Sequence, residues 1–326
     1  GNSTGVDKLY MHSFVIGSDA FDVVTVSGKD AERFLQGQLT CNVCELANNH
    51  WTHGACCNNK GRVIAAFVLV RHRDNFHLCM TRGVAPLLIA ALQKFLPFYK
   101  CTMALQAGSY HLYGLAGECA NKVRASCTDS IGSGNTALLQ PAGDTEGWLC
   151  WLAGANPCAL WFSAQPATAI NQLCEAVAAG TNAQWEALGL LRGLYPFSAP
   201  DSGEYTPQDL HFDASGHVSF SKGCYTGQEI VARMHYRGKP KKQLCLLLLA
   251  TTPSQDDAKT PLTDATGTTV GTVLLTRPLG KRWLALAQLP SDFPAAFDTL
   301  ACAGQTAVAG CEFDETVIQL STLFSP

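Results

Sequence analysis

Charged residues are scarce in this chain, and no apolar run is long enough to cross a membrane. Asp, Glu, Lys and Arg make up 15% of the 326 residues, against 47% hydrophobic residues. This balance is typical of a globular, core-rich protein. The longest apolar runs, such as residues 245–250, fall far short of the roughly 20 residues that a membrane helix needs. The first residues also lack the basic segment and apolar stretch of a secretory signal, so we expect no membrane partner.

An excess of positive charge is also missing. The formal net charge is −3, which argues against wholesale nucleic-acid binding but allows a local basic patch. One basic string is present, formed by Arg233, His235, Arg237, Lys239, Lys241 and Lys242. Two interpretations stay open: a solvated helix end, or a site for a carboxylate tail or a phosphate backbone. A weak RNA contact is kept as a subordinate interpretation.

The cysteine pattern does not indicate disulfides or a metal site. Fifteen cysteines, an odd number, are scattered through apolar segments, a pattern typical of reduced, buried thiols in the cytoplasm. Cys41 and Cys44 have the spacing of a metal or redox pair, and Cys56 and Cys57 follow. No second Cys-x-x-Cys and no His-rich partner motif stands nearby, so we expect no metal ion. No Gly-x-Gly-x-x-Gly motif supports a dinucleotide fold either.

The most informative segment that is present spans residues 222–229, Lys-Gly-Cys-Tyr-Thr-Gly-Gln-Glu. Thr226 and Glu229 stand at capping-box spacing before an apolar helical face, which predicts a helix start at this point. Cys224 would then lie near unpaired N–H groups, with Lys222 close by. Both features favour the thiolate form, so we predict a functional thiol at Cys224.

Residues 220–234 and 236–239, together with the Gln-Gly-Gln-Leu-Thr segment at 36–40 and the Asn-Lys-Gly-Arg segment at 59–62, resemble the motifs of the YgfZ family. This is a family of folate-binding proteins related to the glycine-cleavage T-protein and implicated in iron–sulfur protein maturation and tRNA modification. The ring architecture that the resemblance implies would bring the 36–38 turn, the 59–61 turn and the Cys224 loop together at one pocket. The resemblance implies tetrahydrofolate or a one-carbon derivative as cofactor, and iron–sulfur client proteins or assembly machinery as partners. It implies a functional role for Cys224 and Lys222. The candidate cofactor-binding residues are Gln36, Gln38, Lys60, Tyr225, Gln228, Glu229, Arg233, Arg237 and Lys239.

Two departures from the T-protein pattern affect the expected activity. The stretch 61–66, where aminomethyltransferases carry their catalytic aspartate, has no acid. Relatives usually place an acid that pairs with the pterin near 190–193, where this chain has Leu191 and Arg192; Glu186 is a candidate substitute. We therefore expect an accessory factor that is not a conventional aminomethyltransferase. The alternative is a folate-dependent one-carbon transferase with an altered catalytic set, using Cys224 as nucleophile.

The hydrophobic periodicity predicts an α+β fold with antiparallel sheets. Strands are expected at 21–26, 62–70, 76–80, 102–105, 110–115, 136–139, 148–152, 159–162, 244–249, 271–276, 283–289 and 316–319. Helices are expected at 29–39, 83–95, 119–126, 168–178 and 183–192. The long loop 195–216 is expected to wrap a site. The resemblance implies a three-lobed ring, which we divide into α+β lobes at 1–130 and 131–240 and a small C-terminal β-barrel at 241–326.

Overall fold

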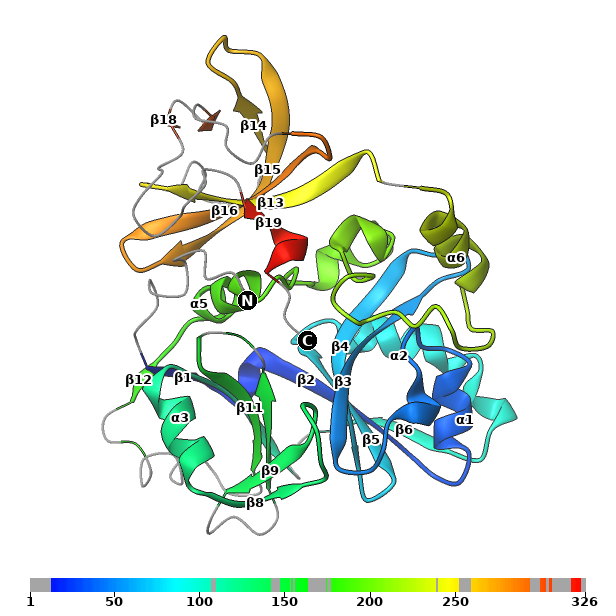
Figure 1. The fold of residues 1–326 in the computed structure, drawn as a ribbon. Coiled ribbons are helices and arrows are strands. Elements are labelled where there is room, and N and C mark those ends of the chain that lie inside the picture. Colours follow the sequence, from blue (N-terminus) through cyan, green and yellow to red (C-terminus); the bar gives the residue numbers. More distant parts are fainter. Residues whose placement is uncertain are drawn as a thin grey trace.

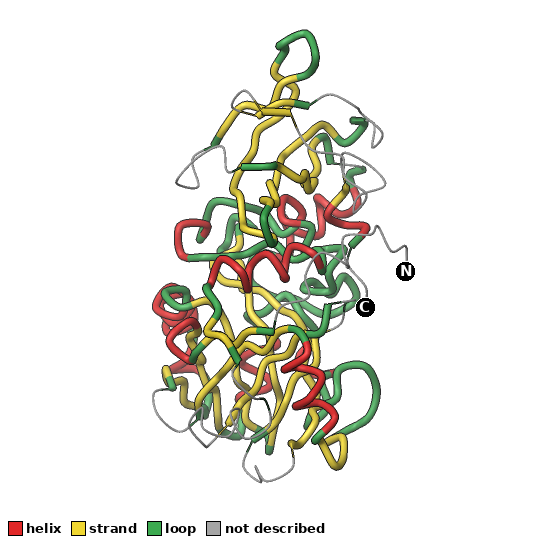
Figure 2. The backbone as a smooth tube through the Cα atoms, turned by 90° about the vertical axis from the view of Figure 1, so that its left-hand side faces the viewer, coloured by secondary structure: helices red, strands yellow, loops and turns green. Residues whose placement is uncertain are grey.

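A computed structural model describes residues 13–106, 110–141, 147–152, 154, 156–163, 174, 177–238, 240–251, 259–293, 300–302, 305–306 and 318–323. The described strands form three sheets, arranged around helix α5 (Asn182–Leu191) and the segment that follows it (Figure 1). The turned view places the C-terminal sheet at one end of the molecule and the other two at the opposite end (Figure 2). This arrangement confirms the expected α+β class, with three sheets among the described residues.

The first sheet comes from residues 21–105 and is antiparallel, with the order β3-β4-β5-β2-β6. Its strands are β2 (Phe21–Ser27), β3 (His50–Cys57), β4 (Val63–His72), β5 (Asn75–Thr81) and β6 (Thr102–Leu105). Two helices belong to it: α1 (Ala31–Gln36), shorter than the expected 29–39, and α2 (Ala85–Gln93), which packs on β4 and β2. Short 3-10 turns lie at Ser18–Ala20, Val43–Glu45 and Leu96–Phe98. Along most of β4, buried residues alternate with half-buried ones, so only one face of this strand is fully covered.

The second sheet has the order β12-β1-β7-β11-β10-β9-β8 and is antiparallel except for the pairing of β1 with β12. Its strands are β1 (Phe14–Ile16), β7 (His111–Ala116), β8 (Cys127–Ile131), β9 (Leu138–Pro141), β10 (Trp148–Leu152), β11 (Cys158–Ser163) and β12 (Ala178–Ala179). Helix α3 (Glu118–Ala125) packs on β7, β9 and β11. A division of the chain at residue 130 would cut β8, and β1 and β7 also pair in this sheet. Most of the expected helix 168–178 lies outside the described residues.

The C-terminal sheet is open in the part of the chain that the structure describes, with the order β18-β17-β14-β15-β16-β13-β19. Its strands are β13 (Lys242–Leu249), β14 (Thr260–Thr263), β15 (Thr269–Leu279), β16 (Arg282–Pro290), β17 (Ala301–Cys302), β18 (Gln305–Thr306) and β19 (Ile318–Gln319). A closed barrel requires its two edge strands to pair. The edges here are β18 and β19, which do not pair with each other, so the expectation of a small β-barrel is corrected to an open sheet.

One hydrophobic core joins the three sheets. A continuous cluster of buried side chains includes Val24 of the first sheet, Leu160 of the second and Leu246 of the third. The predicted long loop is ordered by two 3-10 turns, η5 (Ala199–Asp201) and η6 (Gln208–Leu210), and a third, η7 (Leu320–Thr322), follows β19. No helix in the described part of the chain is long and apolar enough to span a bilayer.

Candidate functional site

The loop that carries Cys224 is fastened to the rest of the protein by Lys222. This side chain is buried, with 8% of its surface exposed. Its ammonium donates hydrogen bonds to three backbone carbonyls, at 2.8 Å to Gln36, 2.7 Å to Leu39 and 2.7 Å to Cys41. These acceptors use all three N–H groups of an ammonium. Burial lowers the pKa of Lys222 to about 8. The contacts therefore give Lys222 a structural role, and the catalytic role expected for it stays a prediction.

Helix α6 (Gln228–Tyr236) follows Cys224, but the expected capping box is wrong. The N-cap is Gly227, at φ 83°, and it has no side chain to accept a hydrogen bond. The Thr226 hydroxyl instead donates to the side-chain oxygen of Gln38 at 2.9 Å, and the Thr226 N–H donates to the Gly37 carbonyl at 3.2 Å. Thr226 thus ties the loop to the turn after α1, because its hydroxyl finds a partner across the fold rather than in its own helix.

The turn between β3 and β4 meets the same loop. Gly61, at φ 71°, lies so close to Ile230 that a Cβ placed there would come within 2.8 Å of the Ile230 Cβ. A Cβ on Gly227 would come within 2.5 Å of the Asn58 carbonyl oxygen. Both positions need glycine, for the positive φ and for the close approach of the two backbones. The three motif segments near residues 37, 61 and 224 are therefore brought together by the fold.

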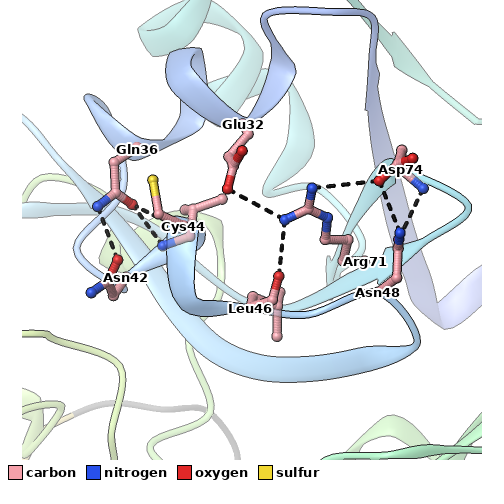
Figure 3. Close-up of polar contacts among 9 residues, drawn as sticks. Glu32, Gln36, Asn42, Cys44, Leu46, Asn48, Arg71 and Asp74 are labelled. Atoms are coloured by element: carbon pink, nitrogen blue, oxygen red, sulfur yellow. Dashed lines mark hydrogen bonds and ion pairs between the residues drawn. The ribbon is translucent and has the colours of Figure 1, made fainter. Parts of the chain in front are cut away.

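Gln36 and the loop after it form a polar support beside this junction (Figure 3). The Gln36 amide donates to Asn42 at 3.0 Å and accepts from the Val43 N–H at 2.7 Å. Arg71 holds the next part of the loop by donating to the Leu46 carbonyl at 3.0 Å. The amide of Gln36 is occupied by these contacts, so it serves the loop rather than a free site.

Cys224 itself is exposed. Cys44 is the other exposed thiol among the fourteen cysteines that the structure describes, all of which are free. Burial and the neighbouring Glu32 raise the pKa of Cys44, in that order of effect. No cluster of three or more His, Cys, Asp or Glu suited to a metal ion occurs among the described residues. The described chain therefore presents Cys224 as an accessible thiol on a firmly held loop.

The remaining predicted cofactor residues do not form one cluster. Tyr225 is buried under the Lys222 ammonium, 5.0 Å from its ring centre, and Gln228 donates to the Gly223 carbonyl at 3.0 Å. Glu229 pairs with Arg233 at 2.9 Å on the surface. Lys60 and Arg237 are exposed, and Lys239 lies outside the described residues.

A separate cavity of about 150 Å³ lies between β3, β4, β5, α5 and the segment 194–217. We call it the central cavity. Its walls are largely aromatic, from Phe21, Phe67, Trp185, Tyr195, Phe197 and Phe212. Its polar lining includes Glu186, Arg192, His53 and His217. None of the predicted cofactor residues, and neither Lys222 nor Cys224, is among its lining residues. The motif loops pack against each other and do not line this cavity, so their expected role in cofactor binding stays a prediction.

The polar groups of the central cavity are held by partners in its walls. Glu186 forms an ion pair with Arg277 of β15, and both side chains are largely buried. Arg192 donates to the thiol of Cys158. Glu186 is the one acidic side chain among the described lining residues. The sequence analysis named Glu186 only as a candidate substitute for the missing acid. Its place on the predicted helix, one position after Trp185, was the feature that could have indicated it.

Two stacked imidazoles form part of the cavity wall. The rings of His53 and His217 lie 4.6 Å apart at 18°. Burial, and then the charge of Arg192, lowers the pKa of His53 to about 3. Burial, and then His53, lowers the pKa of His217 well below its usual value. Both rings are therefore neutral near pH 7. Sequence reasoning missed them, because a lone histidine in a strand or loop gives no signal.

Comparison with known proteins defines the class of this fold. Residues 11–139 match the family described as the GCVT N-terminal domain. The structure resembles the crystal structure of the glycine cleavage system aminomethyltransferase T from Bartonella henselae, with a TM-score of 0.70 over 98% of this chain and 91% of that chain, at 17% identity. The fold is thus that of the glycine-cleavage T-protein.

A nearer relative shows the family within that class. The chain is 33% identical to the tRNA-modifying protein YgfZ of Edwardsiella ictaluri (strain 93-146) over 279 residues. This alignment covers 83% of each sequence. The chain therefore belongs to the YgfZ family.

Proposed function

We propose that this chain is a folate-binding, cysteine-dependent accessory factor in iron–sulfur protein maturation and tRNA modification, acting in the cytoplasm. The tRNA part is supported by the relative's designation as a tRNA-modifying protein. The folate part is supported by the T-protein fold and by the chemistry of the central cavity. The thiol part is supported by the exposure of Cys224.

The central cavity fits the ring end of tetrahydrofolate or of a one-carbon derivative. Flat aromatic walls such as Phe67 and Trp185 suit a planar pterin. Glu186 is the acid in the described lining, and a carboxylate is the group that accepts from pterin N–H groups. The cavity is smaller than the roughly 300–1,000 Å³ of typical ligand pockets, so it suits the ring while the glutamate tail extends outside.

The observation that carries the proposal is the separation of Cys224 from this cavity. The thiol is exposed. The last residue in sequence that lines the cavity is His217, so Cys224 is not part of its lining. An accessible thiol outside the ligand cavity is suited to contact a protein client or its sulfur and iron. This placement does not favour attack by Cys224 on a folate held in the cavity.

A one-carbon transferase remains the alternative, and the cavity lining argues against it. General acid–base catalysis needs a positioned group that can exchange a proton. The one acid in the described lining, Glu186, is paired with Arg277, and residues 61–66 supply none. Incubation with a labelled one-carbon donor and tetrahydrofolate distinguishes the two. The accessory role predicts no product, and sustained turnover would establish the transferase.

The cellular test uses Cys224→Ala in cells that lack their own YgfZ-family protein. We expect this variant to fold and accumulate normally but to fail to restore tRNA modification and iron–sulfur enzyme activity. Cys44→Ala, which removes the other exposed thiol of the described chain, serves as the matched control and should restore both. Full restoration by Cys224→Ala would contradict the cysteine-dependent role.

A further inference from the structure

A basic groove at the end of α6 is distinct from the central cavity and from the Cys224 loop. It has a volume of about 310 Å³ and is lined by Arg233, His235, Arg237, Lys241, Gln208 and Asp213, among others. We call it the α6 groove. It shares no lining residue with the central cavity. Its side chains come from the end of α6, from the turn into β13 and from the 208–213 segment.

Positive charge is concentrated at this groove, although the whole chain has a net charge of −3. Residues 233–242 contain five Lys or Arg and no Asp or Glu. Arg233 is paired with Glu229, and Asp213 is the acid in the lining. Arg237 and Lys241 are exposed, and within the described chain no acidic side chain pairs with either. Two cations of the described chain therefore face solvent without an ion-pair partner, although Asp213 lies in the same lining.

The helix dipole accounts for only part of this charge. Cations in the last turn of a helix are stabilised by its carbonyl end, an effect that fades within that turn. Arg233 and His235 lie in the last turn of α6. Lys241 and Lys242 lie beyond the helix, where β13 begins. Their repulsion has no compensation from the dipole, so an anionic ligand would stabilise this part of the surface.

Aromatic rings stand beside these cations. His235 stacks on Phe220, with ring centres 3.6 Å apart at 13°. Tyr236 lies against His235 edge to face and is 75% exposed. Tyr236 and Phe98 are the two aromatic side chains among the exposed large hydrophobic residues of the described chain. Tyr236 is not itself a lining residue of the groove, but it contacts His235, which is. An exposed ring beside exposed cations provides both stacking for a base and charge for a phosphate.

We propose that the α6 groove binds a single-stranded segment of RNA, with phosphates at Arg237 and Lys241 and a base stacked on Tyr236. The combination of a basic groove and a free aromatic ring is how proteins hold single strands without reading their sequence. A duplex hides its bases, so it would use only the cations. This inference rests on the tRNA part of the proposed function and assigns the surface through which RNA is held.

The charge half of the proposal is tested with the full-length protein and a fluorescein-labelled 12-nucleotide RNA of mixed sequence, by anisotropy between 50 and 200 mM salt. Two phosphate contacts on a single strand, at Arg237 and Lys241, predict a slope of about −1.4 in log K against log salt. The double variant Arg237→Glu/Lys241→Glu should weaken binding by about tenfold or more and flatten this slope. The control Lys100→Glu/Lys281→Glu makes the same charge change at exposed lysines elsewhere. Equal losses in the two double variants would overturn the assignment to this groove.

The stacking half is tested with Tyr236→Ala, expected to weaken RNA binding by about tenfold. Phe98→Ala is the matched control, because Phe98 is 77% exposed and lies away from the groove lining. Equal loss in both, or equal affinity for a duplex of the same sequence, would overturn single-strand binding. The effect of 5-formyltetrahydrofolate on the melting temperature is followed in the same variants. An RNA-binding failure with that effect intact would refute this groove and leave the folate proposal standing.

Discussion

The central cavity and the Cys224 loop differ in how their polar groups are held. In the cavity wall, side chains from different elements satisfy each other, as Glu186 of α5 and Arg277 of β15 do. At the Cys224 loop, a buried ammonium donates to backbone carbonyls, and the thiol itself is exposed. The first arrangement shapes the cavity in which we propose that the ligand binds. The second builds a rigid base under an accessible thiol, which is what contact with a large partner requires.

The largest effect on stability is expected from removing the Lys222 ammonium, which holds the Cys224 loop. Lys222→Met leaves the carbonyls of Gln36, Leu39 and Cys41 without their donor, and we expect a loss of about 3 kcal/mol in the free energy of unfolding. Lys60→Met, at an exposed lysine of the neighbouring turn, is the control and should cost little. Urea denaturation of both proteins measures the difference. Equal stability of the two variants would show that Lys222 does not hold the loop.

The wall of the central cavity can be destabilised by breaking its buried ion pair. Glu186→Gln leaves Arg277 buried beside a neutral partner, and we expect a loss of about 2 kcal/mol. Glu229→Gln breaks the exposed pair with Arg233, where Glu229 is 83% exposed, and should cost about 0.5 kcal/mol or less. Denaturation curves in urea compare the two. A smaller effect at Glu186 than at Glu229 would contradict the account of the cavity wall.

Acid should destabilise the cavity before it affects the loop. The pKa of His53 is lowered from 6.5 to about 3 in the folded protein, so the unfolded chain binds more protons between these values. Stability is therefore lost as the pH falls through this window, by at most about 2 kcal/mol from this ring between pH 7 and 5. We expect His53→Phe, which keeps a ring against His217, to lose that part of the pH dependence. An unchanged slope of unfolding free energy against pH would show that His53 does not carry it.

The smallest effect is expected at the thiol. Cys224 is exposed, so Cys224→Ala makes no buried cavity and should change the free energy of unfolding by less than about 1 kcal/mol. Differential scanning calorimetry measures this change. A large fall in melting temperature would mean that Cys224 packs structurally, and its role in function would then need another explanation.

Local sequence patterns predicted much of the fold, and long-range packing explains what they missed. The strand at 21–26 and the helix at 183–192 were predicted within one residue of β2 and α5, because their periodicity is local. The junction of the three motif segments was also expected. The contacts that form it were not, because Lys222 and Thr226 bond to residues more than 180 positions away.

The central cavity was not predicted, for the same reason. Motif glycines near residues 37, 61 and 227 were taken to line a pocket, whereas two of them allow close backbone packing. The cavity lining comes from scattered residues such as His53, Trp185 and His217. No short motif joins these positions, so only the folded chain shows them together.

The central claim is that ligand binding and thiol function occupy separate regions. The most direct measurement is the melting temperature of the wild type, Cys224→Ala and Glu186→Gln, each with and without saturating 5-formyltetrahydrofolate. A ligand that binds only the folded state raises the melting temperature. We predict the same rise for the wild type and Cys224→Ala, and a smaller rise or none for Glu186→Gln. A rise that disappears in Cys224→Ala but persists in Glu186→Gln would place the folate at the thiol loop and contradict the account.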